Sequence, residues 1–292
     1  MQGCDASVLL TVNPAGGNTE RDAPPNNPSL RGFEVIDAAK AAVERSCPRT
    51  VSCADIVAFA ARDSVNLTGN TFYQVPSGRR DGRVSNATEA FILPGPNSTA
   101  QNLTDGFGRK GLSAEDMVVL SGAHTVGRSH CSSFTNRLYG FSNASDVDPA
   151  ISSAYAFLLR SICPSNSTQF VPNTTTDMDL ITPAVLDNKY YLGLANNLGL
   201  FTSDQALLAN ATLKKAVDEF VKSESKWKSK FAKAMVKMGN IEVLTGTQGE
   251  IRLNCRVINS GSSAAGIELQ MTTSSSGDDD DSAEEFNEIA TN

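Results

Sequence analysis

The sequence predicts a mainly α-helical fold. Apolar residues recur at three- and four-residue spacing in several windows, capping residues precede some of these windows, and strand signals are short and few. The chain has 292 residues, of which 40% are hydrophobic and 20% charged, enough for the core of one large domain or two small ones. No internal repeat or linker interrupts the pattern before about Ser260, so we expect one domain over residues 1–260.

The first two helices are predicted from apolar spacing and from a cap. The first ends before Pro48, and its apolar stripe consists of Phe33, Ile36, Ala39 and Val43. The second begins at Ser52, because Ser52-x-x-Asp55 resembles a capping box. One face of this second helix is expected to carry Ile56, Phe59 and Ala60.

Two more helical stretches are predicted further along the chain. One begins at Ser113, where Ser113-x-x-Asp116 fits a capping box. It places Met117, Leu120 and His124 on one side, so the histidine is expected to face inward. The last stretch runs to Gly239, with an interruption expected around residues 223–225. Its stripe consists of Leu213, Val217, Phe220, Trp227, Phe231, Met235 and Met238.

Two segments have the composition of loops. Between Thr68 and Thr104, Gly, Pro and Asn dominate, which predicts long surface loops with small hairpins. Residues 261–292 are rich in Ser, Gly, Asp and Glu, and we expect a disordered tail there because so little apolar area can be buried. The acidic run from Asp278 to Glu288 is either a sorting propeptide or a solubilising end.

The charge pattern bears on the partners of the chain. Lys and Arg total 25 against 32 Asp and Glu, a formal net charge of -7, and no basic stripe could follow a phosphate backbone. Nucleic acid is therefore not an expected partner. No run of about 18 apolar residues occurs, so no membrane span is expected.

The cysteines indicate the compartment. The chain has six scattered cysteines without a C-x-x-C pair, and only two histidines. A structural zinc site is therefore not expected, and the cysteines favour disulfides in a secreted or vacuolar protein. The alternative is a cytosolic protein whose surface is rich in Ser, Thr and Asn. No signal peptide is found in this sequence, which conflicts with the secreted interpretation. The glycosylation pattern N-x-[ST] favours the first interpretation, and it recurs at Asn66, Asn86, Asn97, Asn102, Asn143, Asn166, Asn173 and Asn210.

Any histidine chemistry must use His124 or His130. His124 lies in LSGAHTVG, where Gly122, Ala123 and Gly127 would let a flat ligand approach the imidazole. His130 lacks such neighbours. A buried histidine beside small residues can equally be a satisfied core group, so the residues alone leave both interpretations open.

Several stretches occur together in one order. They are GCDASVLL at 3–10, CPRTVSCADI at 47–56, VPSGRRDGR at 75–83, LSGAHTVGRSHC at 120–131, LDNKYY at 186–191, SDQALL at 203–208 and MGNIEVLTGTQGEIRLNCRVIN at 238–259. Together they resemble the class III secretory plant peroxidases, which are haem enzymes. The resemblance implies the plant peroxidase fold, with haem between distal and proximal helical halves.

The resemblance implies that His124 is the proximal ligand of the iron of haem b and that Asp204 accepts a hydrogen bond from its other ring nitrogen. A carboxylate behind the imidazole raises its donor strength, which stabilises oxidised iron. Taken alone, Asp204 could be a solvated N-cap. Pro94, in LPGP, resembles the position where small aromatic donors dock at the haem edge, with a plain loop proline as the alternative.

Two calcium sites are also implied, because calcium prefers several hard oxygen ligands. The distal site would retain Asp5, Ser7 and the carbonyl of Gly3. Taken alone, such spacings also fit loops that satisfy their own backbone. The proximal site would help to hold the helix that carries His124, and its ligands would be Thr125, Asp179, Thr182, Asp187 and the carbonyl of Val185.

Further pairings are implied by the resemblance. Asp55 and Arg79 resemble the family's structural ion pair, and we assign them to stability rather than catalysis. The family partners of two cysteines are absent from this chain. The implied disulfides are Cys53–Cys255 and Cys131–Cys163, and Cys4 and Cys47 are left over.

The match fails at the N-terminus. Family members carry an Arg and a His just upstream of the stretch that begins at Gly3, and these are absent here. Peroxide cleavage needs such a base and cation, and His130 would lie on the same side of the haem as His124. Glu20 and Asn26 match the network that supports the distal base. We expect the distal N-terminal helices to be missing because the gene model from which the sequence was translated lacks its first exon.

The sequence therefore predicts a monomeric haem peroxidase that reduces hydrogen peroxide and oxidises phenolic donors by one-electron steps. The expected settings are hydrogen peroxide catabolism, the response to oxidative stress, and cell-wall phenolic or lignin metabolism. The alternative is a catalytically impaired glycoprotein that binds haem or calcium, because the distal Arg and His are absent from this chain.

Overall fold

The structure, a computed structural model, describes residues 3–165 and 174–259, and within these ranges it is mainly α-helical, as predicted. Residues 1–259 form one unit by their internal contacts. The predicted tail, residues 261–292, and two of the glycosylation patterns, at Asn166 and Asn173, lie outside the described residues.

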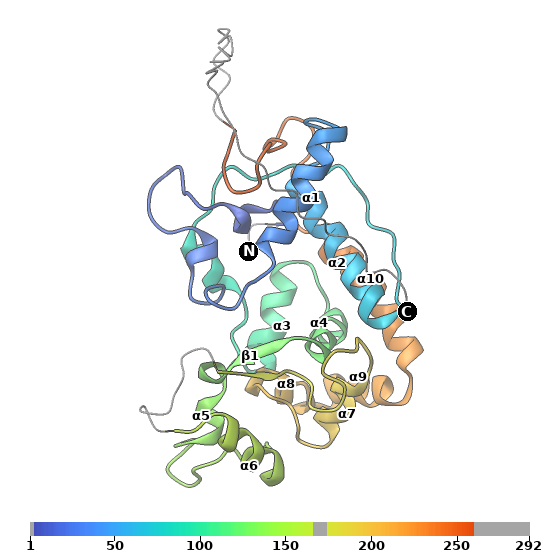
Figure 1. Cartoon of the computed structure of the whole chain (residues 1–292). Helices are drawn as coiled ribbons and strands as arrows, with labels where there is room; N and C mark the ends of the chain where they lie inside the picture. Colours follow the sequence, from blue (N-terminus) through green and yellow to red (C-terminus); the bar gives the residue numbers. More distant parts are fainter. Residues whose placement is uncertain (1–2, 166–173, 260–292) are drawn as a thin grey trace, which may run out of the picture. The chain divides into compact units, whose positions relative to one another are not determined.

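Figure 1 shows the elements in chain order. Two short strands, β1 (Arg128–His130) and β2 (Thr175–Asp177), pair antiparallel, with His130 opposite Thr175. The described α-helices are α1 (Phe33–Ser46), α2 (Cys53–Gly69), α3 (Ala100–Arg109), α4 (Ala114–Ser121), α5 (Thr135–Leu138), α6 (Ser153–Ile162), α7 (Lys189–Ala195), α8 (Thr202–Gln205), α9 (Ala211–Lys222) and α10 (Glu224–Met238).

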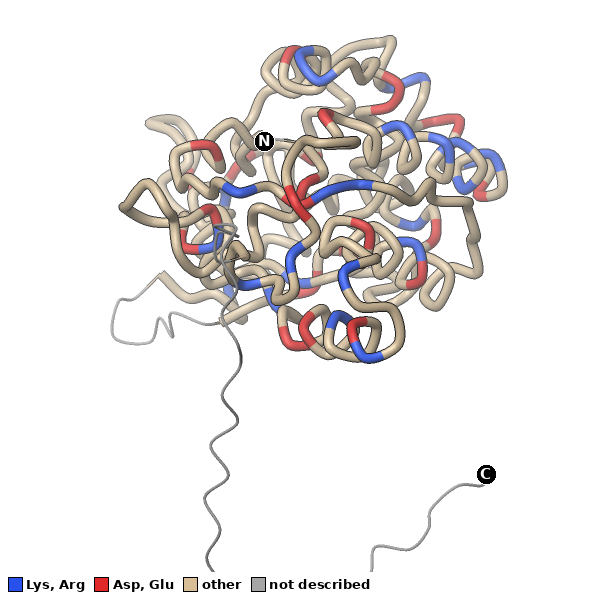
Figure 2. The backbone as a smooth tube through the Cα atoms, turned by 90° about the horizontal axis from the view of Figure 1, so that it is seen from above, with Lys and Arg blue, Asp and Glu red and all other residues tan. Residues whose placement is uncertain are grey.

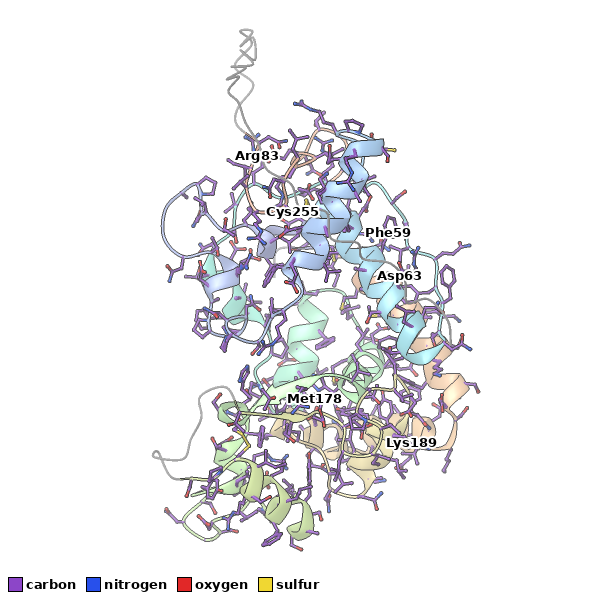
Figure 3. All side chains as sticks on the ribbon, viewed as in Figure 1. Phe59, Asp63, Arg83, Met178, Lys189 and Cys255 are labelled. Atoms are coloured by element: carbon purple, nitrogen blue, oxygen red, sulfur yellow. A yellow bond between two sulfur atoms is a disulfide. The ribbon has the colours of Figure 1, made fainter. Side chains whose placement is uncertain are left out.

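The first two predicted helices are present as α1 and α2. Ser52 caps α2, because its hydroxyl accepts a hydrogen bond from the N–H of Asp55 at 3.0 Å. The Asp55 carboxylate does not complete a capping box; it accepts instead from the N–H of Gly78 at 2.7 Å. The predicted apolar face is right only in part, because Ile56 is buried whereas Phe59, labelled in Figure 3, is half-buried.

The predicted third helix is α4, and both bonds of its capping box between Ser113 and Asp116 are formed. It ends at Ser121, so His124 lies in a following 3₁₀ helix, Gly122–Thr125, and not on one continuous α-helix with Met117. The side chain of His124 is 40% exposed, because it lines a cavity instead of pointing into packed core.

The predicted interruption of the last helical stripe is confirmed. α9 ends at Lys222 and α10 begins at Glu224. Ser223 lies between them in an extended conformation, and its hydroxyl accepts a hydrogen bond from the N–H of Lys226 at 3.3 Å. The break therefore comes from a cap that starts a new helix.

The segment predicted as loops with hairpins is largely loop between α2 and α3, as expected, but the small hairpins are not formed within these described residues. Its main chain pairs with the C-terminal segment instead of with itself, since Arg80 donates to the carbonyl of Leu244 at 2.9 Å. In addition, α3 begins within this segment. Thr99 caps that helix, because its hydroxyl accepts from the N–H of Asn102 at 3.2 Å. Gly106 and Gly108 inside α3 weaken the helical pattern of the sequence.

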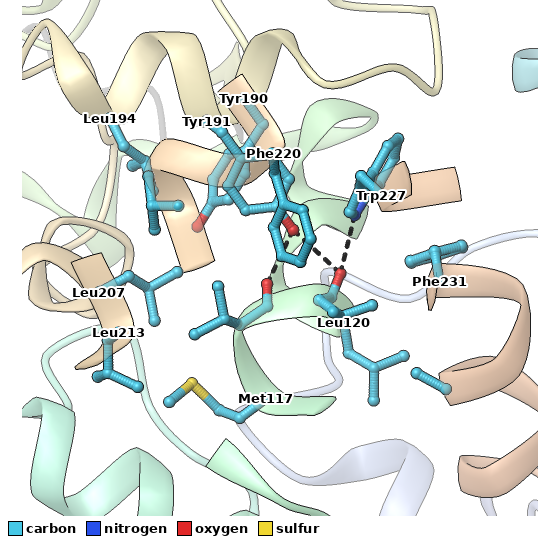
Figure 4. Packing of buried hydrophobic residues seen from close by; sticks show 14 of the residues in the cluster. Met117, Leu120, Tyr190, Tyr191, Leu194, Leu207, Leu213, Phe220, Trp227 and Phe231 are labelled. Carbon is cyan, nitrogen blue, oxygen red and sulfur yellow. Dashed lines mark hydrogen bonds between the residues drawn. The ribbon is translucent and has the colours of Figure 1, made fainter. Parts of the chain in front are cut away.

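The largest core surrounds α4, which packs against α3, α9 and α10 (Figure 4). Residues 117–120 of α4 are all buried. Aromatic side chains from α7, α9 and α10 complete this core, and they are Tyr190, Tyr191, Phe220, Trp227 and Phe231. The core therefore fixes the end of α4 and the 3₁₀ helix that follows it.

Two disulfides lie in smaller clusters. Cys131–Cys163 belongs to a cluster formed largely by α5 and α6. Cys53–Cys255 joins the start of α2 to the C-terminal segment, where Figure 3 labels Cys255. These are the pairs that the resemblance implies. Among the described cysteines, the half-buried Cys4 and the exposed Cys47 carry free thiols.

Charges of both signs are interspersed along the backbone (Figure 2). Exposed ion pairs such as Lys214–Asp218 on α9 and Arg128–Asp177 between the strands belong to this mixed surface. No helix in the described part of the chain combines the length and the apolar character needed to cross a bilayer.

Candidate active site

The end of α4 places His124. The hydroxyl of Tyr191 donates to the carbonyl oxygens of Val118 at 2.8 Å and Val119 at 3.1 Å, and the indole Nε1 of Trp227 donates to Val119 at 3.1 Å (Figure 4). These donors satisfy carbonyls at a helix end, where intrahelical partners run out. The chain therefore leaves the α-helix here and enters the 3₁₀ turn that carries His124.

The small residues around His124 serve different purposes. A Cβ on Gly122 would lie 2.5 Å from the hydroxyl of Tyr191 and 2.6 Å from Nε1 of Trp227, so Gly122 makes room for these rings and not for a ligand. Gly127 has a φ of 100°, which favours glycine. Of the three small residues predicted to admit a ligand, Ala123 is the one that lines the His124 cavity.

His124 and Asp204 are joined by a hydrogen bond of 2.7 Å between Nδ1 and Oδ1. Asp204 lies buried in α8, where its Oδ2 accepts from the N–H of Phe201 at 2.8 Å. The ring of Phe201 also meets the imidazole edge-on, at 5.6 Å between centroids. Because an ionised carboxylate can only accept, Nδ1 of the neutral ring carries the proton and Nε2 keeps its lone pair.

Burial and charge act in opposite directions on this pair. Burial lowers the pKa of His124, but the Asp204 carboxylate outweighs it and holds that pKa above its ordinary value. Burial raises the pKa of Asp204, but His124 and the donors from Phe201 and Tyr190 hold it below its ordinary value. The carboxylate is therefore ionised at neutral pH, as its role as an acceptor requires.

The ring of His124 lines a cavity of 490 Å³, and no described residue forms a hydrogen bond with its Nε2. Small-ligand sites commonly have volumes of about 300–1,000 Å³ and mostly apolar walls. The walls here come from α2, α3, α4 and α10, and Pro94 lies in them. The polar side chains of the lining, apart from His124 and Asp204, are Ser64, Ser121 and Ser203.

Oxygen atoms converge on Thr125, the residue after His124. Its Oγ1 lies 3.2 Å from Oδ2 of Asp179, 3.1 Å from the carbonyl oxygen of Val185 and 3.4 Å from Oδ1 of Asp187. The hydroxyl of Thr182 lies 3.3 Å from Asp179 and 3.0 Å from Asp187. Burial, together with the nearby Asp187 carboxylate, raises the pKa of Asp179.

This oxygen cluster combines two carboxylates with two hydroxyls and a main-chain carbonyl, the donor types that calcium prefers. In residues 3–165 and 174–259, no group of three or more His, Cys, Asp and Glu gathers to hold a metal ion. A cation at Thr125 would therefore depend on the neutral oxygens as well as on Asp179 and Asp187.

The residues expected on the distal side line a separate cavity of 170 Å³. Ser7 donates to Oε2 of Glu20 at 2.9 Å, and the side-chain amide of Asn26 donates to the main-chain oxygen of Glu20 at 2.7 Å. Gly3 and Asp5 also line this cavity, and none of these residues lines the His124 cavity. The structure therefore keeps this group together and apart from His124.

The expected ion pair between Asp55 and Arg79 is present, with Nη1 and Oδ1 at 3.0 Å and both side chains buried. Nη2 of Arg79 also donates to the carbonyl oxygen of Gly239 at 2.7 Å. The pair thus connects α2 to the end of α10. It does not line the His124 cavity, which agrees with a structural role.

Tyr190 and Phe201 both contact Asp204, and no motif in the sequence predicts a role for either residue. Tyr190 lies in LDNKYY, a stretch noted only for its resemblance, and no local spacing links it to a residue fourteen positions away. His130, the other histidine, is buried in β1 away from the cavity, and its Nδ1 has no hydrogen-bond partner among the described residues.

Comparisons with known proteins agree on one family. A family model described as Peroxidase matches residues 1–223. The chain is 64% identical to Peroxidase 1 of Zea mays over 274 residues, which are 92% of this chain and 74% of that protein. It is 54% identical to Peroxidase 5 of Vitis vinifera over 261 residues, 89% of this chain and 78% of the relative. It is 46% identical to Peroxidase C2 of Armoracia rusticana over 267 residues, which are 89% of this chain and 75% of that protein.

Proposed function

The chain belongs to the peroxidase family, and on that premise we propose that it is a haem peroxidase that reduces hydrogen peroxide with electrons taken singly from phenolic donors. The observation that carries this proposal is the His124–Asp204 hydrogen bond of 2.7 Å at the wall of the 490 Å³ cavity. The cavity suits a flat, largely apolar group, and the free Nε2 suits a metal centre at its middle.

His124 would hold the iron of haem b through Nε2. Asp204 keeps the proton on Nδ1, fixes the plane of the ring and increases the electron density that Nε2 can donate. Bound haem supplies the redox chemistry that joins peroxide reduction to donor oxidation. Leu103, Phe107 and Phe231 form an apolar part of the same wall, which suits a largely apolar group better than water.

Calcium is proposed at two positions. Thr125, Asp179, Thr182, Val185 and Asp187 would hold the proximal ion directly behind the haem ligand. A second ion would bind near Asp5 and Ser7, whose group also lines the 170 Å³ cavity with Glu20. These oxygens are the hard donors that calcium requires.

Phenolic donors are proposed because Pro94, an exposed residue, lies in the wall of the His124 cavity. A flat aromatic molecule could pack against this ring at the cavity entrance. Lignin precursors, auxin and wall phenolics are compatible with such a site. We further propose that the protein is a monomer and that it is secreted or vacuolar. The two disulfides and the exposed Asn66, Asn97 and Asn143 support this location.

A second candidate function is a glycoprotein that binds haem or calcium with impaired turnover. The observation in its favour is the lining of the His124 cavity, where His124 and Asp204 are the titratable residues among those described. Glu20 and Asn26 line a different cavity. Cleavage of peroxide needs a base and a charge-stabilising donor at the bound oxygens.

Haem titration followed by turnover separates the two candidates. The apo chain is titrated with haem and followed by the Soret band, and then the peroxide-dependent oxidation of a phenol is compared with that of free haem. His124→Ala should abolish specific binding, whereas His130→Gln, away from the cavity, should retain it. A rate far above free haem supports the peroxidase, and binding without such a rate supports the impaired protein. Equal binding by the parent and His124→Ala contradicts haem ligation by His124 and therefore both haem-binding candidates.

A further inference from the structure

One oxygen of the Asp204 carboxylate accepts two hydrogen bonds. Oδ1 lies 2.7 Å from Nδ1 of His124 and 3.0 Å from the hydroxyl of Tyr190, whereas Oδ2 accepts from the N–H of Phe201. Asp204 and Tyr190 are 2% and 4% exposed, so the shared oxygen lies in the protein interior. Tyr190 and His124 therefore share one buried acceptor.

We propose that Tyr190 is a positioning residue that limits how strongly Asp204 draws the Nδ1 proton of His124, and thereby how strongly Nε2 donates to haem iron. This inference deepens the proposed function and rests on it. A buried tyrosine hydroxyl needs a partner, and here the partner is the carboxylate that orients the proposed iron ligand.

The physical argument is competition for one oxygen. Each donor withdraws electron density from Oδ1, and in a low-dielectric site the bonds of such a network influence one another. Without the Tyr190 hydroxyl, the full charge of Oδ1 acts on Nδ1–H, so the imidazole gains anionic character. A more basic axial ligand stabilises oxidised iron, and the reduction potential falls.

Tyr191 provides a matched control. It is the next residue, it is also fully buried, and its ring contacts that of Tyr190 at 5.1 Å between centroids. Its hydroxyl, however, donates to the main-chain oxygens of Val118 and Val119 and not to Asp204. Tyr190→Phe and Tyr191→Phe thus each remove a hydroxyl group from a buried tyrosine. Of the two, Tyr190→Phe alone removes a hydrogen bond to the Asp204 carboxylate.

The test measures the haem-loaded full chain. Tyr190→Phe should shift the iron reduction potential to a more negative value and raise the frequency of the iron–histidine stretching vibration in the reduced protein. Tyr191→Phe should leave both close to the parent values, because Trp227 still donates to the carbonyl oxygen of Val119 and holds the end of α4. No shift in Tyr190→Phe, or equal shifts in the two variants, would overturn the proposal.

A second measurement uses the chain without haem. Nitrogen-edited NMR of the imidazoles, of which the chain has two, reports the Nδ1–H proton of His124. Tyr190→Phe should move this resonance downfield through a stronger bond to Asp204, and Tyr191→Phe should not. If the parent fails to bind haem through His124, the proposed function fails by itself, while an unmoved proton resonance in Tyr190→Phe rejects the competition at Asp204.

Discussion

Arg137 and Asp148 form an ion pair of 2.7 Å in which the two side chains are 1% and 6% exposed. The same guanidinium donates to the main-chain oxygens of Gly199 and Leu200 through Nη1. These residues immediately precede Phe201, whose N–H binds the carboxylate of Asp204. A buried pair outside the cavity thus supports the segment that leads to the proposed iron site.

Arg137→Ala is expected to lower the free energy of unfolding by about 3–5 kcal/mol, because Asp148 is left as an unpaired buried charge. Arg128→Ala is the control, since Arg128 forms an exposed pair with Asp177 and should cost less than about 1 kcal/mol. Urea unfolding of both variants checks this prediction. Equal losses would show that burial of the Arg137 pair does not set its contribution.

Gly122 and Gly108 should respond in opposite directions to the same substitution. Gly122→Ala places a methyl group against Tyr191 and Trp227 and should destabilise by about 1–3 kcal/mol through overpacking. Gly108→Ala lies in α3 with open space around the new Cβ, and should stabilise by about 0.5–1 kcal/mol through helix propensity. Melting temperatures give the sign of each effect. A neutral Gly122→Ala would contradict the close approach of the two rings.

The pKa of Asp116 predicts a stability change at acidic pH. Burial raises this pKa, but Lys237, at 2.6 Å, and Ser113 outweigh burial and hold it below its ordinary value. A carboxyl whose folded pKa is lowered stabilises the protein above the unfolded pKa of about 3.9, and this contribution is lost as the pH falls through the folded pKa.

Asp116→Asn should therefore be less stable than the parent by about 1 kcal/mol at pH 7, with the gap closing below about pH 4. Urea unfolding of both proteins between neutral and acidic pH measures the gap. Asp105→Asn on α3, where the carboxylate accepts from Gln101, serves as the comparison and should show little effect. A gap that persists undiminished in acid would show that charge on Asp116 is not its cause.

The elements that the sequence predicts well are those with local signals. The capping box of Ser113 and Asp116 and the break at Ser223 depend on residues within one helical turn, and both are present. α3 was missed because two glycines weaken its pattern, and its cap at Thr99 lies in a segment rich in loop residues. A helix boundary can therefore be predicted from the sequence where its cap stands beside a clear helical pattern, and not where glycines and loop residues surround the cap.

The candidate site depends on contacts that no local pattern contains. His124 could be singled out because the chain has two histidines and one of them lies among small residues. Asp204, eighty positions away, was expected only from the resemblance. Tyr190 was not expected, because its bond to Asp204 follows from the packing of α7 against the 3₁₀ helix. Such pairings are set by tertiary structure.

Calcium should stabilise the chain through the oxygen cluster at Thr125. A free calcium concentration 100-fold above the dissociation constant would add about 2.7 kcal/mol to the free energy of unfolding. Removal of calcium with a chelator should therefore lower the melting temperature by several degrees. Asp179→Asn removes one of the two carboxylates and should weaken this response. Asp177→Asn changes an exposed carboxylate two residues away, paired with Arg128, and should retain it. Melting curves with calcium and with chelator test all three proteins. Because Thr125 adjoins His124, haem affinity should fall with the same treatment, and a parent indifferent to calcium would remove the cation from this site.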